Sequence, residues 1–352
     1  MFQDISLPEL LEKRNQQNHT LVDVRSPKEF HEGTIPGSIN IPIFTDDERA
    51  EVGTIYKQVG PEAAKDRGLE IFSKKLPTYI REFKQINTPI TVFCWRGGMR
   101  SKTAAAVVNL MGIEANRLSG GIRTYRNFVI DVLKKESFKP EFIVLNGFTG
   151  TGKTAILKKL AENDFPVMDF EKMAGHRGSI FGHIGLIPSN QKRFDSLLVE
   201  KTLKFEKEPY VFVEGESKRI GRVIIPDFIY KKKETGLQLI IQIPMEERVR
   251  NILDDYQPWN DPSKFDEAFK IIKKRIHTPI AKEVEEFLKQ QNYHEATRLL
   301  LEGYYDPRYI HSSNNFLGEK EIITASNVED AYQKILLTLK NRGIFTHRQF
   351  IS

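Results

Sequence analysis

The stretch Gly147-Phe148-Thr149-Gly150-Thr151-Gly152-Lys153-Thr154 decides how the second half of this 352-residue chain folds. It matches the phosphate-loop pattern G-x-x-x-x-G-K-[ST] at every position. The apolar run Phe142-Ile143-Val144-Leu145 before it predicts a buried strand, and residues 153–162 after it predict a helix. A chance glycine-rich turn is the alternative, but such a turn needs neither flanking element. The stretch therefore predicts an α/β domain that binds a phosphorylated ligand.

The residue types in this loop suit phosphate binding. Gly147, Gly150 and Gly152 allow backbone N–H groups to wrap around a phosphate. Lys153 neutralises the phosphate charge, and Thr154 is a candidate ligand for Mg²⁺, although no metal ligand is certain. The pattern indicates phosphate binding without indicating that a nucleotide is hydrolysed.

Further apolar runs place the loop in a larger domain. Three of them predict strands, at residues 166–168, 210–213 and 237–243. From about Glu246 the pattern is mostly helical to the end, and the polar, proline-terminated run 134–140 predicts a linker. We therefore expect a P-loop NTPase-like α/β domain with a helical C-terminal part over 139–352, after a separate domain over 1–138.

Several charged residues follow the predicted strands of the second domain. Asp169, Glu214 and Glu216 lie where many P-loop enzymes place a metal-organising or acid–base carboxylate. Exposed carboxylates at a strand end are an equal alternative. His176 and Arg177 lie in a glycine-rich loop, which predicts a lid or a substrate contact, although this pair could equally be plain surface. Each of these five residues therefore has two interpretations, a functional residue or an ordinary surface residue.

The first domain repeats the alternation of strand and helix. β-branched, apolar runs predict strands at 21–24, 39–42, 90–93 and 113–118, and residues 61–85 predict a helix. This alternation is typical of a parallel sheet covered by helices. The whole chain is therefore predicted to be α/β, with two such domains in series.

Cys94, the only cysteine, directly follows the predicted strand at 90–93. The tight loop Trp95-Arg96-Gly97-Gly98-Met99-Arg100 comes next, and a helix is expected over 102–110. Backbone N–H groups, a helix N-terminus and the guanidiniums of Arg96 and Arg100 all favour the thiolate, which is the reactive form of a thiol. A buried structural cysteine is the alternative, but an inert thiol needs neither the Gly-Gly pair nor the arginines. We therefore expect Cys94 to be reactive.

The loop size indicates what arrives at the thiol. Five residues separate Cys94 from Arg100, and this C-x5-R spacing forms a cradle for a tetrahedral oxyanion with Arg100 aimed at its oxygens. Protein-tyrosine phosphatases use the same spacing, but they usually have His where Phe93 stands here. Sulfurtransferases that carry only a persulfide commonly have a loop one residue shorter. A phosphatase or a sulfurtransferase tethered to a small-molecule kinase therefore stays open, as does a non-catalytic RNA-binding module.

Charge and composition are compatible with an RNA partner without requiring one. The net charge is +6, with local basic runs at 231–233 and 273–275. The N-terminus has no signal-peptide pattern, and no apolar run is long enough to span a bilayer. A lone cysteine excludes an intramolecular disulfide and favours a reducing compartment. We expect a cytoplasmic protein without a membrane partner.

Several stretches of the first domain resemble a rhodanese domain. They are Asp23-Val24-Arg25-Ser26-Pro27-Lys28-Glu29-Phe30, Gly33-Thr34-Ile35-Pro36-Gly37-Ser38-Ile39-Asn40-Ile41-Pro42, the Cys94 loop and Leu118-Ser119-Gly120-Gly121. Thr34 departs from the pattern, because many rhodaneses have His there. A rhodanese domain fused to a P-loop domain is uncommon and is similar to the bacterial tRNA 2-selenouridine synthases. More specific stretches carry the same resemblance: Glu48-Arg49-Ala50-Glu51-Val52-Gly53-Thr54-Ile55-Tyr56-Lys57-Gln58, Cys94 to Ser101, Gly175-His176-Arg177-Gly178-Ser179 and Tyr304-Tyr305-Asp306-Pro307-Arg308-Tyr309.

This resemblance implies a reaction and its co-substrates. The family replaces sulfur by selenium at C2 of the wobble 2-thiouridine in the tRNA anticodon loop, through an S-geranylated intermediate. The resemblance implies that the loop from Gly147 to Thr154 holds geranyl diphosphate, with Mg²⁺ as a candidate metal. It also implies that the Cys94 loop receives selenophosphate, which a separate selenophosphate-producing enzyme supplies. Cys94 either carries the selenium or orients it, and Arg96 assists the anion or the tRNA backbone.

An anticodon-loop substrate also suggests how the RNA is held. Unstacked bases of an exposed loop can stack on aromatic side chains, and Trp95 beside the thiol is a candidate surface. Packing at the base of the loop is an equally good interpretation of Trp95. Lys and Arg side chains of the helical C-terminal part would contact phosphates of the anticodon stem.

Overall fold

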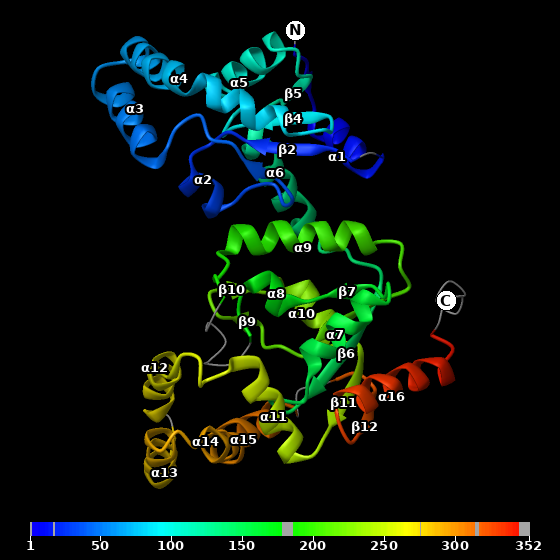
Figure 1. Ribbon diagram of the computed structural model, residues 1–352. Coiled ribbons are helices and arrows are strands. Elements are labelled where there is room, and N and C mark those ends of the chain that lie inside the picture. The colour runs from blue at the N-terminus through cyan, green and yellow to red at the C-terminus, as the bar shows by residue number, and fades with distance from the viewer. Residues whose placement is uncertain (1, 17, 178–185, 275, 314–316, 345–352) are drawn as a thin grey trace. The chain divides into compact units, whose positions relative to one another are not determined.

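The computed structural model describes residues 2–16, 18–177, 186–274, 276–313 and 317–344 (Figure 1). The chain divides into two compact units, one of Met1–Lys135 with Asp195–Glu200 and one of Glu136–Phe194 with Lys201–Ser352. The predicted boundary after residue 138 lies close to this division. Each unit contains its own parallel sheet, so the predicted α/β class is confirmed.

The first unit is built on a five-stranded sheet with the order β1-β5-β4-β2-β3. Its strands are β1 (Asp4–Ile5), β2 (Thr20–Asp23), β3 (Ile39–Asn40), β4 (Ile90–Phe93) and β5 (Ala115–Leu118). All four pairings are parallel, and every residue of the central strand β4 is buried. A strand buried on both faces explains the continuous apolar run at 90–93. Cys94 directly follows the carboxyl end of β4.

Six helices accompany this sheet in the described part of the first unit. They are α1 (Leu7–Gln16), α2 (Pro27–Glu32), α3 (Asp46–Gln58), α4 (Pro61–Lys84), α5 (Met99–Leu110) and α6 (Gly121–Lys134). The helices α3 and α4 lie side by side (Figure 1). The helix after Cys94 begins at Met99 rather than at the predicted Lys102, because Gly98 caps it. Arg100 therefore lies in the first turn of α5 and not in the loop before it.

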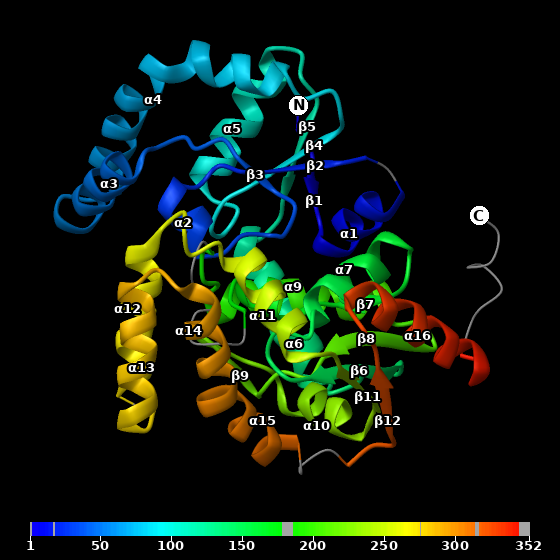
Figure 2. The same ribbon diagram turned by 60° about the horizontal axis from the view of Figure 1, so that its bottom comes forward.

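The second unit has another five-stranded parallel sheet, with the order β12-β11-β6-β8-β7. Its strands are β6 (Glu141–Gly147), β7 (Val167–Met168), β8 (Tyr210–Glu214), β11 (Leu237–Gln242) and β12 (Lys320–Thr324). The strand β6 lies between β8 and β11 and leads directly into the phosphate loop (Figure 2). A short antiparallel hairpin, β9 (Arg219–Ile220) and β10 (Val223–Ile224), stands apart from this sheet.

The strand β12 was not predicted. The chain after Glu246 was expected to be mostly helical, and that expectation overlooked this strand. This strand lies at the edge of the sheet, and only Ile323 among its residues is buried. An edge strand tolerates charged residues such as Lys320 and Glu321, so it lacks the apolar run that signals a central strand. The rest of that prediction holds, because helices make up most of the described chain beyond β11.

The helices of the second unit form two groups. The first group is α7 (Lys153–Glu162), α8 (Phe170–Ala174), α9 (Gln191–Phe205), α10 (Asp227–Thr235) and α16 (Val328–Asn341). Of these helices, α9 is shared, because its residues 195–200 belong to the first unit. The second group is α11 (Met245–Tyr256), α12 (Pro262–Lys273), α13 (Thr278–Lys289), α14 (Tyr293–Leu300), a π-helical turn η2 (Leu301–Tyr305) and α15 (Asp306–Ser313). This second group has a hydrophobic cluster of its own, which includes Val284, Leu288 and Leu300. Among the described helices, none combines the length and hydropathy that a membrane-spanning segment needs.

Candidate active sites of the two units

Cys94 directly follows β4, and its side chain faces the first turn of α5. Its Sγ lies 3.1 Å from Ser101 Oγ, and the Cys94 side chain is only 3% exposed. Ser101 is fully buried and can hydrogen-bond to the sulfur, a contact that sequence reasoning missed. The signal was present as a serine at the start of the helix after the loop. The thiol is therefore held at a helix N-terminus by a buried hydroxyl.

The loop after Cys94 is pinned through its carbonyl groups. The Cys94, Trp95 and Gly97 oxygens accept from Ile122 N at 2.9 Å, Arg123 N at 3.1 Å and Arg117 Nη1 at 2.8 Å. Gly121 allows this close packing, since a Cβ there would lie 2.2 Å from the Cys94 oxygen. In the described part of the chain, the N–H groups of residues 95–98 donate to no protein acceptor. These N–H groups are therefore available to bind an anion at the thiol, which is what the loop pattern predicts.

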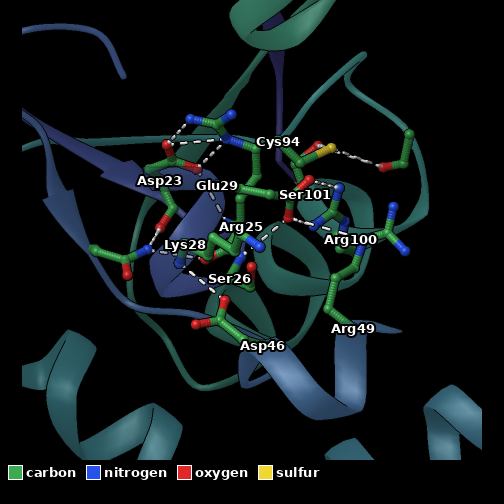
Figure 3. A network of polar contacts seen from close by, with 12 residues as sticks. Asp23, Arg25, Ser26, Lys28, Glu29, Asp46, Arg49, Cys94, Arg100 and Ser101 are labelled. Carbon is green, nitrogen blue, oxygen red and sulfur yellow. Dashed lines mark hydrogen bonds and ion pairs between the residues drawn. The ribbon is translucent and has the colours of Figure 1, made fainter. Parts of the chain in front are cut away.

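Arg100 binds a carboxylate of the protein (Figure 3). Its Nη2 donates to Glu29 Oε1 at 3.2 Å, and its Nη1 donates to the other oxygen of Glu29. Burial raises the pKa of Glu29, but the bonds from Arg100 outweigh it and hold this pKa below its usual range. Arg49 Nε lies 3.9 Å from the same carboxylate. The predicted contact between Arg100 and an anion thus has an internal competitor, Glu29, which the sequence did not reveal.

A buried polar network around Asp23 and Arg25 lies near the Cys94 loop. Arg25 and Asp23 are 2% and 0% exposed and make a bidentate ion pair, with Arg25 Nη2 at 2.6 Å from Asp23 Oδ2 (Figure 3). Thr34, which departs from the usual rhodanese histidine, donates to Asp23 Oδ2 at 2.9 Å. The Arg25 guanidinium lies 6.0 Å from the ring centre of Trp95. The network therefore lies against the Trp95 ring and gives Thr34 a structural role.

Three side chains of the predicted loop are open to solvent. Trp95 is 45% exposed and Met99 is 58% exposed, although both are large apolar side chains. Arg96 is exposed and forms no ion pair in the part of the chain that the structure describes. The open Trp95 ring favours the stacking interpretation over packing at the loop base.

The phosphate loop lies between β6 and α7, and its lysine is turned onto the loop itself. Lys153 Nζ donates to the carbonyl oxygens of Gly147 at 2.8 Å and Phe148 at 3.2 Å. Burial lowers the pKa of Lys153. Gly150 and Gly152 both adopt positive φ, and Gly152 caps α7. The loop therefore has the predicted cradle conformation, with a lysine that a phosphate can draw away from the carbonyls.

Four carboxylates surround the start of α7, one more group than the sequence indicated. Thr154 Oγ1 donates to Glu171 Oε2 at 3.1 Å, and Glu171 was missed even though it follows Asp169 by two residues. Glu214 Oε1 accepts from Glu171 N at 2.6 Å. Burial raises the pKa values of Asp169, Glu214 and Glu216. Glu214 is only 2% exposed, which excludes the interpretation of this residue as an exposed strand-end carboxylate.

The four carboxylates near the start of α7 do not by themselves form a complete metal site. Within the described residues, no three His, Cys, Asp or Glu side chains are arranged to hold a metal ion. Mg²⁺ typically keeps several waters and binds through one or two protein oxygens plus substrate phosphates. Glu214 Oε2 is buried without a hydrogen-bond partner, and the Thr154 hydroxyl lies on the same cluster. These groups fit a hydrated cation that arrives with a phosphorylated ligand.

His176 and Arg177 lie beside other elements of the second unit. A Cβ on Gly221, in the turn between β9 and β10, would lie 2.8 Å from the His176 ring. The Arg177 guanidinium lies 5.0 Å from the ring centre of Tyr256, in α11. Gly178 and Ser179, quoted with them, lie outside the described residues. The role of this pair as a lid or substrate contact stays a prediction.

The acidic cluster predicts that the protein loses stability as the pH rises. Burial, followed by the charge of Glu216, raises the pKa of Glu171 from 4.5 to about 8. The folded state then binds a proton more tightly than the unfolded state, so stability falls as the pH rises from 4.5 through 8. We expect a lower melting temperature at pH 9 than at pH 6 in the absence of ligand and divalent cations. Thermal unfolding across this range measures it.

The matched variants for this experiment are Glu171→Gln and Glu162→Gln. The Glu171→Gln variant keeps an acceptor for Thr154 and should flatten the pH dependence. The Glu162→Gln variant changes an exposed carboxylate in α7 and should leave it as steep as before. A wild-type melting temperature that rises from pH 6 to pH 9 would contradict the burial of these acids.

The two sites define a class of protein in which an α/β domain with a cysteine loop precedes an α/β domain with a phosphate-loop motif. A rhodanese-like domain model matches residues 6–127, and a model described as the tRNA 2-selenouridine synthase AAA domain matches residues 140–340. The chain therefore belongs to the tRNA 2-selenouridine synthase family. The predicted fold and the resemblance noted in the sequence are both confirmed by these matches.

Named relatives agree with this assignment. The chain is 37% identical over 257 residues to a tRNA 2-selenouridine synthase of Bdellovibrio bacteriovorus, covering 71% of this chain and 67% of the relative. It is 30% identical over 341 residues to that of Aeromonas salmonicida, covering 86% and 91%. The match to that of Nitrosomonas europaea, at 36% identity, covers 67% of this chain but 63% of the relative, less than two thirds of its length.

One solved structure resembles part of this chain. The N-terminal domain of a putative ATP/GTP binding protein from Clostridium difficile 630 shares 35% identity with this chain. The likeness covers 36% of this chain and 98% of that domain, with a TM-score of 0.34.

Proposed function

We propose that this chain replaces sulfur by selenium at C2 of the wobble 2-thiouridine in tRNA, with selenophosphate as the selenium donor. One observation carries the proposal: a complete cysteine loop and a complete phosphate loop occur in one chain of this family. The relatives' name supplies the tRNA substrate and the selenium product. A separate enzyme that makes selenophosphate would supply the donor.

In the first step, the thiouridine sulfur is alkylated by geranyl diphosphate. The sulfur attacks C1 of the geranyl group, the C1–O bond breaks, and diphosphate leaves. The loop from Gly147 to Thr154 would bind the diphosphate, and Lys153 would exchange its two carbonyl acceptors for phosphate oxygens. Thr154 and the carboxylates near it would hold Mg²⁺, which neutralises charge on the leaving group. The expected role of this loop is to stabilise the departing diphosphate.

In the second step, selenium replaces the alkylated sulfur. Selenium attacks C2, geranyl thiol leaves, and water cleaves the P–Se bond to release inorganic phosphate. An S-alkyl sulfur is a better leaving group than the thiocarbonyl it replaces, which is the reason for the first step. The N–H groups of residues 95–98, which donate to no acceptor in the described part of the chain, would hold the tetrahedral oxyanion of selenophosphate beside the Cys94 thiol, which orients this selenium donor.

The tRNA would be held by stacking and by its phosphates. Trp95 is 45% exposed next to Cys94, so its ring is available to an unstacked anticodon base. Arg96 beside it is exposed and is available to a phosphate of the same loop. The net charge of +6 favours association with a polyanion.

Nucleoside mass spectrometry tests the proposal. The protein is incubated with 2-thiouridine-containing tRNA, geranyl diphosphate, selenophosphate and Mg²⁺, and the tRNA is digested. We expect both S-geranyl-2-thiouridine and 2-selenouridine. Turnover of thiosulfate or an aryl phosphate without either nucleoside would instead favour the sulfurtransferase or phosphatase interpretation.

The competition between Glu29 and an anion for Arg100 gives a second test of this site. In the Glu29→Gln variant, Arg100 loses its carboxylate partner, and a negative charge leaves the neighbourhood of the Cys94 loop. We expect inorganic phosphate to bind about five-fold more tightly, because the pair it must displace is worth about 1 kcal/mol. Calorimetric titration with phosphate measures this change.

The control for this prediction is Glu70→Gln, which removes an exposed carboxylate from its pair with Arg67 on α4. Phosphate affinity should not change in that variant. Weaker phosphate binding by Glu29→Gln would show instead that Glu29 orients Arg100 for the anion rather than competing with it.

A further inference from the structure

A buried arginine of the helix α11 contacts the phosphate loop from outside the motif. Arg248 is 4% exposed, and its Nε donates to the carbonyl oxygen of Thr149 at 2.9 Å. Its guanidinium also lies 4.9 Å from the ring centre of Phe148. Phe148 and Thr149 are variable positions of the motif, which its pattern leaves undefined.

The same guanidinium is held on its other side by a carboxylate. Arg248 Nη1 and Nη2 donate to the two oxygens of Asp306 at 2.9 and 2.5 Å, in a bidentate pair. Asp306 begins α15, directly after the π-helical turn η2, and its side chain is 18% exposed. Arg248 therefore links the start of α15 to the loop.

A second contact from α11 reinforces the first. Asn251 Nδ2 donates to the carbonyl oxygen of Gly150 at 2.9 Å. Gly150 has φ +84°, and a Cβ there would lie 2.6 Å from the carbonyl oxygen of Arg248. The backbones of the loop and the helix thus approach so closely that only glycine fits.

We propose that Arg248, held by Asp306, is a positioning residue that fixes the backbone of the phosphate loop in its binding conformation. With the carbonyl groups of Thr149 and Gly150 anchored to α11, the loop N–H groups stay aimed at the phosphate before it arrives. The two anchors lower the conformational entropy that the loop loses on binding. The helical C-terminal part thereby contributes to phosphate affinity without touching the ligand.

The alternative role of a buried arginine near a phosphate loop is direct contact with the phosphate, as in an arginine finger. The Asp306→Asn variant separates the two roles by the sign of its effect. If Arg248 bound phosphate itself, loss of its carboxylate partner would leave ligand affinity unchanged or increase it. If Arg248 positions the loop, loss of Asp306 releases the guanidinium from its geometry and decreases affinity.

The first arm of the test measures binding of inorganic pyrophosphate with Mg²⁺ to the full chain by calorimetry. This arm rests on the proposed function, because it assumes that the loop binds a diphosphate. We expect Asp306→Asn and Arg248→Met each to weaken binding about tenfold, the scale of one hydrogen bond to a charged group. The double variant should lose little more than either single variant, because both changes break one unit.

The second arm measures hydrogen exchange of the ligand-free protein, so it does not depend on the proposed function. Peptides that cover residues 147–154 should exchange about tenfold faster in Asp306→Asn and in Arg248→Met than in the wild type. The matched control is Arg250→Met, which removes an exposed arginine of the same helix from its pair with Glu247. In that variant both exchange and pyrophosphate affinity should be unchanged.

The outcomes decide between the roles even where one variant folds poorly. Faster loop exchange together with weaker binding in Asp306→Asn supports positioning, and Asn251→Ala should show the same direction. Unchanged loop exchange in Asp306→Asn and Asn251→Ala overturns it, as does unchanged or tighter pyrophosphate binding by Asp306→Asn. If the wild type binds no pyrophosphate, the proposed role of the loop fails, while the exchange arm still decides whether Arg248 positions it.

Discussion

Replacing Cys94 with alanine or serine is expected to abolish formation of 2-selenouridine while S-geranylation continues at its normal rate. Cys94 is the only thiol in the chain, so no other cysteine can take its place. Its Sγ lies at the N-terminus of α5, at the loop whose N–H groups would hold selenophosphate. We expect selenium incorporation to fall by at least about 10²-fold, the scale on which misplacement of a reacting group acts. Mass spectrometry of digested tRNA reads both nucleosides in one sample.

Of the two variants, the serine variant gives the more specific test of the thiol. Serine is close to cysteine in size and can keep a hydrogen bond with Ser101, so the buried site should stay packed. Equal melting temperatures of wild type and Cys94→Ser would show that a loss of selenium transfer is chemical. Full selenium transfer by Cys94→Ser would show that the thiol takes no part in the reaction. A parallel loss of geranylation would show that the two domains do not divide the steps as proposed.

Replacing Lys153 with methionine is expected to stop both products when unmodified thiouridine tRNA is the substrate. Lys153 is the motif residue whose ammonium reaches the loop, where it would meet the diphosphate. We expect geranylation to fall by about 10²- to 10³-fold, as when one preorganised donor to a developing charge is removed. The 2-selenouridine product should disappear with it, because its precursor is no longer made.

Supplying tRNA that already carries S-geranyl-2-thiouridine should restore selenium transfer by the Lys153→Met variant. This rescue separates an ordered two-step reaction from general damage to the protein. The matched control is Lys158→Met, which changes a lysine of the same helix whose side chain is 78% exposed. That variant should behave as wild type. Failure of the geranylated tRNA to rescue Lys153→Met would show that the phosphate loop also serves the selenium step.

The sequence predicted the elements whose signals are local. The helix over 153–162 agrees with α7 to the residue, because glycine caps its start and the motif fixes that position. The strand at 90–93 also agrees with β4, since a fully buried central strand is a continuous apolar run. Cys94 was identified because it directly follows a predicted strand, and Lys153 because it belongs to the phosphate-loop motif at the start of a predicted helix.

Features that depend on distant partners could not be predicted. The pairing of Arg100 with Glu29 joins residues 71 positions apart, and nothing in the local pattern indicates it. The contact between Arg248 and Thr149 spans 99 positions. Glu171 was missed because its contact with Thr154 depends on how β7 lies relative to the phosphate loop. In each case the sequence shows the charge, and the fold determines what the charge meets.

The order of the two steps is the central claim, and one measurement tests it most directly. Thiouridine tRNA is first incubated with the protein, Mg²⁺ and geranyl diphosphate, and then purified away from the donor and the protein. Fresh protein is then added with selenophosphate alone, and the nucleosides are quantified by mass spectrometry. We predict S-geranyl-2-thiouridine after the first incubation, and its conversion into 2-selenouridine with one geranyl thiol per selenium incorporated after the second. Formation of 2-selenouridine at the same rate from tRNA that was never geranylated would contradict this order of steps.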